Sequence, residues 1–203
     1  MSNGTREQLL DAATALFAEK GFYGVSIANV ADELGLTKQA LLHHFGSKER
    51  LYGEVLKRIS DRIEGFVQAA QSKRAAPEEQ FVELLQSTLE TTLESNARTR
   101  LLMRELLDNR GRAENAGSWY LKPFLEALVA MLKRVPAWKA ASDADALAAV
   151  YQLLGAINYF VVSSPTLKSM MGADAYDRLV KAFPKQLERL IKAALAHPPA
   201  PRR

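Results

Sequence analysis

Residues 26–48, SIANVADELGLTKQALLHHFGSK, predict two short helices joined by a tight turn and followed at once by a third. Ser26 suits a helix N-cap, and the apolar residues after it recur at the period of one buried helical face. Gly35 is expected to end this helix, because glycine adopts a positive φ without the penalty of a Cβ atom. Thr37 then suits the cap of a second helix. The spacing predicts a helix-turn-helix, with small residues where the two helices cross.

The outer side of the second helix carries side chains suited to contact DNA. In a helix-turn-helix this helix lies in the major groove, with its first residues at base edges and other groups on the phosphates. Ser47 is expected to cap a third helix that starts at Lys48, and a helix N-terminus beside a cation favours phosphate. The predicted DNA-binding residues are Ser26, Thr37, Lys38, Gln39, Leu42, His43, His44 and Lys48. From the pattern alone, an ordinary helical corner is the alternative.

From Thr5 to about Tyr52 the chain resembles the DNA-binding domain of the TetR family of transcriptional regulators. The matching features are a first helix ending in ALFAEKGFYG, the core IANVADELGLTKQALLHHF, and GSKERLY at the start of the fourth helix. Two positions depart from the usual family pattern. Val25 stands where threonine is frequent, and Leu42 stands where a tyrosine commonly contacts the DNA backbone. A leucine at position 42 can still touch a thymine methyl group.

The charge of the chain is not concentrated in this segment. The net charge is +4, but the first 50 residues hold five Lys and Arg against six Asp and Glu. Residues 34–48 are locally basic, with two lysines, two histidines and no acid. Because one copy offers few phosphate contacts, we expect tight binding to require two copies and to show a modest salt dependence per subunit.

The rest of the chain is predicted to be helical, because no stretch alternates apolar and polar residues as a half-buried strand does. The expected fold is all-α, with about nine helices in total. A three-helix DNA-binding domain is predicted over residues 1–50, a helical ligand-binding and dimerisation domain over residues 51–196, and a flexible tail over residues 197–203. The sequence also predicts a capping box that begins at Thr5 and a loop over residues 165–172.

Two segments near the C-terminus predict a subunit interface. The helix expected over residues 146–162 is apolar nearly all round, so it needs to be buried on every side, and a partner subunit would bury it. The last helix has apolar residues at alternating spacings of four and three, which indicates a two-helix seam. The predicted interface residues are Gln152, Gly155, Tyr176, Val180, Phe183, Leu187 and Leu190. In the TetR family the last two long helices pair with those of a second subunit, so the resemblance implies a homodimer on a palindromic operator in double-stranded DNA.

The resemblance further implies a small-molecule effector bound among the middle helices. The aromatic and apolar side chains there favour a lipophilic effector. Asn158 needs a polar partner within an apolar helix, and Arg104 could meet an anionic group. The predicted ligand-binding residues are Phe66, Leu89, Met103, Arg104, Leu107, Trp119, Tyr120, Phe124, Tyr151, Asn158 and Tyr159. The alternative is a plain core for most of them and a solvated face for Arg104. A repressor released from DNA by its effector is the expected mechanism, with a transcriptional activator of the same fold as an alternative.

Other classes of protein find less support. The chain has no cysteine and three histidines, so we expect no metal site, and no nucleotide-binding or nucleophile motif predicts an enzyme or a cofactor. The polar start MSNGTREQ lacks the pattern of a signal peptide, and no convincing membrane span is present, so a cytoplasmic protein is expected. A helical enzyme and a structural dimer without DNA binding are the alternatives from other classes.

Overall fold

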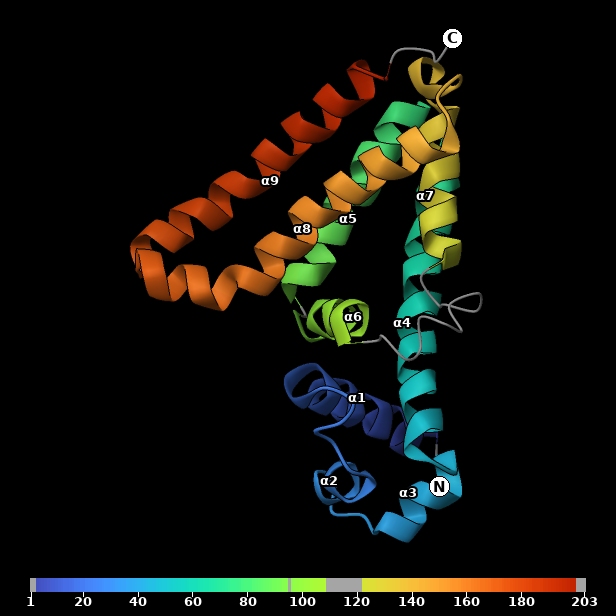
Figure 1. The fold of residues 1–203 in the computed structure, drawn as a ribbon, viewed down its shortest axis with the longest axis vertical. Coiled ribbons are helices and arrows are strands. Elements are labelled where there is room, and N and C mark those ends of the chain that lie inside the picture. Colours follow the sequence, from blue (N-terminus) through green and yellow to red (C-terminus); the bar gives the residue numbers. More distant parts are fainter. Residues whose placement is uncertain (1–2, 95, 109–121, 200–203) are drawn as a thin grey trace. The chain divides into compact units, whose positions relative to one another are not determined.

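The computed structural model describes residues 3–94, 96–108 and 122–199 (Figure 1). These residues form nine α-helices and one short 3-10 helix, with no strand among them, so the predicted all-α fold is confirmed. The chain divides into two compact units. The first comprises Met1–Arg62 and Ser95–Tyr120, and the second comprises Ile63–Glu94 and Leu121–Arg203.

The helices alternate between the two units along the chain. The first unit holds α1 (Asn3–Lys20), α2 (Ile27–Asp32), α3 (Lys38–Phe45), the first part of α4 (Lys48–Gln71), and α6 (Asn96–Asp108). The second holds the end of α4, α5 (Pro77–Glu94), α7 (Lys122–Arg134), the 3-10 helix η2 (Pro136–Trp138), α8 (Asp143–Met171) and α9 (Ala173–Ala196). The division therefore differs from the sequence-based boundary at residue 50, because α6 packs on α1.

The first unit is built around α1. Phe17 is fully buried and meets the ring of Tyr52 from α4 edge to face, with the ring centroids 4.9 Å apart. The helix begins at Asn3, so Thr5 lies inside it and the predicted capping box at Thr5 is wrong. Asparagine and threonine both favour helix starts, and the sequence pattern could not separate the two positions.

The second unit has its own apolar core, to which α5, α7, α8 and α9 contribute. The aromatic rings of Phe160 and Phe183 stack with centroids 3.7 Å apart, which joins α8 to α9. Trp138 is buried, and its Nε1 donates to the carbonyls of Ala194 and Leu195 at 3.2 Å each. The indole of η2 therefore ties down the end of α9, whose last carbonyls lack partners within the helix.

One long helix, α8, replaces the helix and loop that the sequence predicted. It continues through Pro165 to Met171, so the loop predicted over residues 165–172 is wrong. Proline lacks an N–H group and crowds the carbonyl four residues earlier. In the turn before it, the hydroxyl groups of Ser164 and Ser163 donate to the carbonyl of Phe160 at 2.9 Å and 3.4 Å. The carbonyl that loses its helical donor at Pro165 is that of Val161, so the two hydroxyl bonds to Phe160 do not replace the missing bond, although such bonds favour a bend in a helix. The helix ends only at Gly172, where φ is +79°.

Candidate nucleic-acid interface

The turn between α2 and α3 is fixed by local hydrogen bonds. Ser26 accepts a bond from the backbone N–H of Asn29 at 3.1 Å, and the side chain of Asn29 accepts one from the N–H of Ser26 at 2.9 Å. This reciprocal pair is a capping box. Gly35 has a φ of +64°, and Thr37 caps α3 by accepting a bond from the N–H of Ala40 at 3.2 Å. The two predicted caps and the predicted glycine bend are confirmed.

The two sides of α3 differ in exposure. Leu41 and Phe45 are buried on the inner side, and Leu42 is partly buried. The four polar side chains on the outer side, Lys38, Gln39, His43 and His44, are exposed. This helix therefore presents a row of hydrogen-bonding groups on a rigid base, as a helix that enters the major groove requires. The residues that the structure describes include no group of three His, Asp or Glu side chains that could hold a metal ion.

Lys48, at the start of α4, is engaged inside the first unit. Its Nζ donates to the carbonyls of Phe22 and Val25 at 3.0 Å and 3.1 Å, and it lies 4.2 Å from the centroid of the Phe22 ring. An ammonium group has three donors, so only one remains for a phosphate. Lys48 thus braces the first turn of α4 against the loop that precedes α2, which the sequence prediction of a phosphate contact did not anticipate.

Arg50 is a candidate phosphate contact that the sequence prediction missed. It lies in the first turn of α4, is exposed, and forms no ion pair with any residue in the described part of the chain. Its backbone N–H donates to the hydroxyl of Ser47 at 3.2 Å, so the helix start beside it is capped. A cation at a helix N-terminus indicates a phosphate site. The sequence prediction assigned this role to Lys48, the first residue of α4, and did not consider Arg50.

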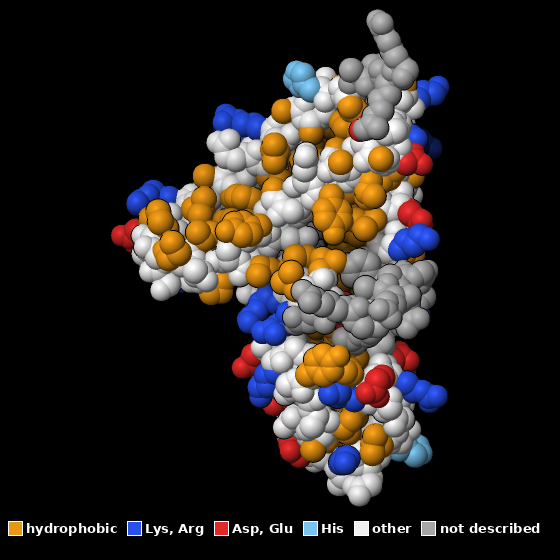
Figure 2. Space-filling model, in the orientation of Figure 1, with side chains coloured by type: hydrophobic (Ala, Val, Ile, Leu, Met, Phe, Trp, Pro, Cys, Tyr) orange, Lys and Arg blue, Asp and Glu red, His pale blue; other side chains and the backbone are white. Residues whose placement is uncertain are grey.

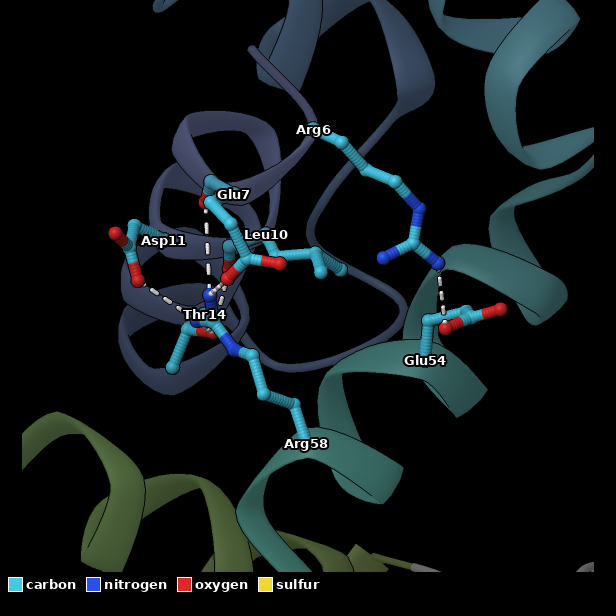
Figure 3. Close-up of polar contacts among 7 residues, drawn as sticks. All are labelled: Arg6, Glu7, Leu10, Asp11, Thr14, Glu54 and Arg58. Atoms are coloured by element: carbon cyan, nitrogen blue, oxygen red, sulfur yellow. Dashed lines mark hydrogen bonds and ion pairs between the residues drawn. The ribbon is translucent and has the colours of Figure 1, made fainter. Parts of the chain in front are cut away.

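Ion pairs hold α4 against α1 (Figure 3). Arg58 of α4 donates to the carboxylates of Asp11 at 2.8 Å and Glu7 at 3.2 Å, both on α1. Arg6 of α1 pairs with Glu54 of α4 at 2.8 Å. Each exposed pair contributes little by itself, but both arginines bridge the same two helices. The helix that carries Arg50 is therefore held at several points along α1.

The helix α6 also belongs to this unit. The hydroxyl of Tyr52 donates to the buried carboxylate of Glu105 at 2.5 Å, which joins α4 to α6. Arg104 donates to the carbonyl of Glu19 at 2.8 Å, at the end of α1. Arg104, predicted to contact an effector, is thus placed as a cap on the last turn of α1, where a cation is favoured.

The other predicted ligand-binding residues are placed in several surroundings. Met103 is partly buried on α6, and Leu107 is exposed there. Phe66, Leu89 and Phe124 pack in or against the core of the second unit. Asn158 is partly buried on α8, and Trp119 and Tyr120 lie outside the described residues. Tyr151 and Tyr159 are 53% and 78% exposed on α8, so the structure places them on an outer face of the helix, where the sequence predicted the lining of a pocket.

The predicted interface residues divide between an exposed face of α8 and the inner side of α9. Gln152 and Gly155 are exposed beside Tyr151 and Tyr159, and Leu190 on α9 is 47% exposed. Leu187, by contrast, is 2% exposed in the core of its own chain, so its assignment to an interface is corrected. The remaining α9 residues, Tyr176, Val180 and Phe183, are partly buried. Within the seven-residue repeat of α9, Val180, Phe183 and Leu187 pack in or against the chain's own core, whereas Leu190 is exposed.

The N-terminal unit is a helix-turn-helix DNA-binding domain. Its features are the capped turn, the exposed outer side of α3 and the start of α4 that Lys48 holds in place. Residues 9–55 match the family model of bacterial regulatory proteins, tetR family. The N-terminal part of the chain is thus similar to the DNA-binding part of these regulators.

Comparison with curated proteins finds matches over about a third of the chain. The transcriptional repressor KstR2 of Rhodococcus jostii is 40% identical over 63 residues, which is 31% of this chain and 31% of that protein. The transcriptional activator FasR of Mycolicibacterium smegmatis is 38% identical over 65 residues, 32% of this chain and 30% of that protein. The chain spans about a third of the length of the curated relatives that it matches.

Solved structures match over almost the whole fold. The fatty acid degradation regulator FadR of Bacillus halodurans has a TM-score of 0.74 at 17% identity, covering 97% of this chain and 99% of that chain. A TetR-family regulator from Bordetella parapertussis has a TM-score of 0.72 at 20% identity, covering 98% of this chain and 100% of that chain. At these identities the likeness concerns the fold of both units.

Among the described helices, α8 is long and apolar enough to cross a membrane, with a mean hydropathy of 1.5. The core helices of soluble proteins share this composition.

Proposed function

We propose that the protein is a cytoplasmic, ligand-responsive transcriptional regulator that binds a palindromic operator as a homodimer and is released from it by a small lipophilic effector. The observation that carries this proposal is the exposed outer side of α3, held by caps at both helices of the turn. A buried or acid-paired α3 would not suit a DNA groove. The family and its named relatives are regulators, which supports the same reading over an enzyme.

The DNA contacts of one subunit are few. Lys38 and Arg50 supply phosphate or base contacts as full cations, and Gln39 and His43 supply hydrogen bonds to base edges. The exposed carboxylates of Asp32, the last residue of α2, and Glu33, its C-cap, limit the local positive charge. A single unit would therefore bind weakly, and two units on a two-fold symmetric site would bind tightly.

The face of α8 that supports dimerisation is apolar and exposed. Leu147, Tyr151, Gly155 and Tyr159 recur every four residues and form one stripe, with exposed fractions of 41%, 53% and 78% for the three large side chains. Figure 2 shows hydrophobic side chains gathered over the face that carries α8. An apolar stripe of this kind marks an interaction surface, and the glycine lets a second helix approach closely. A second copy of α8 is the partner that a symmetric dimer provides.

The effector is proposed to bind in the apolar interior to which Phe66, Leu89 and Phe124 contribute. A ligand changes DNA affinity only if it binds the DNA-free state more tightly than the DNA-bound state. The continuous helix α4 supplies a route, because it begins just after α3 and ends in the unit that holds these apolar residues. Repression is favoured because relatives include a named repressor, and the named activator FasR keeps activation as the second candidate.

Selection of bound DNA from a random pool tests the proposal. We expect the purified protein to enrich a palindrome, with half-sites about 34 Å apart or a multiple of that distance. The enriched DNA is then bound in competition with scrambled DNA of the same composition. Enrichment of no sequence, or of a single half-site only, would contradict the proposed operator-binding dimer.

A further inference from the structure

An open groove in the second unit offers chemistry that the proposed regulator does not use. Its volume is about 570 Å³, within the range of about 300–1,000 Å³ typical of small-molecule sites. It lies where the first turns of α5, the region of η2 and the last turn of α9 meet. None of the residues predicted to contact DNA or the effector lines this groove.

The floor of the groove is apolar and well supported. Val82, Val135 and Leu195 come from three different parts of the chain and are buried members of the core of the second unit. Ala137 and Ala196 line the same space and are exposed, and each contributes only a methyl group. An alkyl chain laid along these residues would leave water on one side and gain apolar contact on the other.

Part of the rim is already neutralised. Glu83 forms an ion pair with Lys73, and Lys192 pairs with Glu188 at 2.5 Å. The hydrogen bond from Lys192 and its charge lower the pKa of Glu188, and a hydrogen bond from Gln86 acts in the same direction. These paired groups leave little net charge for a ligand.

Two carboxylates on the rim remain unpaired. Glu78 and Glu79 line the groove in the first turn of α5, and neither forms an ion pair with any residue that the structure describes. The last turn of α9 also borders the groove through Leu195 and Ala196, and its carbonyl groups carry negative partial charge. Carboxylates and helix end therefore favour the same ligand charge.

We propose that this groove binds an amphiphilic cation, with its alkyl chain on the apolar floor and its ammonium group beside Glu78 and Glu79. A free fatty acid would place its carboxylate beside the same two groups and be repelled. The groove is lined by none of the residues proposed to contact the lipophilic effector, and its occupancy does not require DNA.

Titration calorimetry on the full chain tests the charge preference. The probes are decyltrimethylammonium, decanoate and decyl maltoside, each below its micelle concentration, so that the chain length is constant and the head group varies. We expect one cation bound per chain, with at least about tenfold weaker binding of the anionic and neutral probes, and weaker cation binding as salt rises. Equal binding of the three probes would overturn the proposal.

Substitutions locate the site. The double variant Glu78→Gln/Glu79→Gln should bind the cation roughly five- to tenfold more weakly, since each exposed carboxylate contributes modestly. Glu90→Gln changes an exposed glutamate farther along α5 and should leave the affinity unchanged. Ala137→Trp fills the groove from an exposed position and should abolish binding. Wild-type affinity in the double variant or in Ala137→Trp, with an unchanged circular dichroism spectrum, would place the cation elsewhere and refute the proposal.

Discussion

At the scale of single residues, the start of α4 divides two tasks between two cations. Lys48 uses two of its donors on the carbonyls of Phe22 and Val25, and it is partly buried. Arg50 lies two residues further on, exposed and without an ion-pair partner among the described residues. Both residues follow the same N-cap, so their sequence positions alone do not reveal which of them contacts the DNA. We therefore propose that the lysine chiefly stabilises the fold and that the arginine chiefly contributes to DNA affinity.

Arg50→Ala should weaken DNA binding without affecting the fold. The loss of one phosphate contact in each of two subunits should lower the slope of log affinity against log salt by about 2. The melting temperature should stay within about 1 °C, because the side chain is exposed and surface substitutions change stability little. Fluorescence anisotropy at several salt concentrations measures the slope. An unchanged slope would show that Arg50 does not reach a phosphate.

Lys48→Met should lower the stability of the protein more than its affinity for DNA, the opposite of what is expected for Arg50→Ala. Methionine keeps much of the side-chain volume but leaves two carbonyls without their charged donor, so we expect a loss of about 2 kcal/mol in the free energy of unfolding. Urea denaturation measures this loss. At a temperature where the variant is fully folded, its DNA affinity should fall less than that of Arg50→Ala. A stable Lys48→Met protein with strongly weakened DNA binding would reverse the assignment of the two cations.

At the scale of elements, α8 shows how one helix tolerates an internal proline. Ser164 donates to the carbonyl of Phe160 at 2.9 Å, one turn before the disturbed backbone around Pro165. A proline usually ends a helix in a sequence-based prediction, because its missing N–H and its ring oppose the preceding turn. Here the packing of α8 against α9 outweighs that local preference.

A double-mutant cycle tests the role of the serine. Ser164→Ala should destabilise the protein by about 1 kcal/mol in the wild-type background, because a carbonyl loses its extra donor. In the Pro165→Ala background residue 165 again donates to the carbonyl of Val161 and the helix needs no bend for the hydroxyl of Ser164 to support, so the same change should cost less than about half as much. Thermal denaturation of the four proteins gives the coupling. Equal costs in the two backgrounds would show that the hydroxyl group does not compensate for the proline.

The exposed stripe of α8 gives a second prediction at this scale. Tyr159→Asp should convert the dimer to a monomer, because a charge on the apolar stripe would be buried without a partner in the dimer. Tyr23→Asp is the matched control, since Tyr23 is 82% exposed and Tyr159 is 78% exposed. Sedimentation velocity at micromolar concentration compares the two. A Tyr159→Asp protein that remains dimeric would place the interface on another face.

At the scale of the whole molecule, local features could be predicted and distant contacts could not. The caps at Ser26 and Thr37 and the bend at Gly35 depend on adjacent residues, so the sequence contained the whole signal. The inner and outer faces of α8 could not be separated, because a helix that is apolar nearly all round has no periodic signal to orient it. The contact of Arg104 with the carbonyl of Glu19 joins residues 85 apart, which no local pattern indicates.

The contact between Arg104 and Glu19 makes the N-terminal unit depend on α6, a helix far along the chain from the turn between α2 and α3. Leu101 of α6 and Leu128 of α7 are both fully buried, but they belong to the first and the second unit respectively. Leu101→Ala and Leu128→Ala should each cost about 2–5 kcal/mol of stability. At temperatures where both variants are folded, only Leu101→Ala should speed hydrogen exchange in α1 and weaken DNA binding. The reason is that Leu101 belongs to α6, which packs on α1, and α1 is in turn ion-paired with α4. If Leu128→Ala has the same effects on α1, the two units unfold together and α6 has no separate role in the DNA-binding unit.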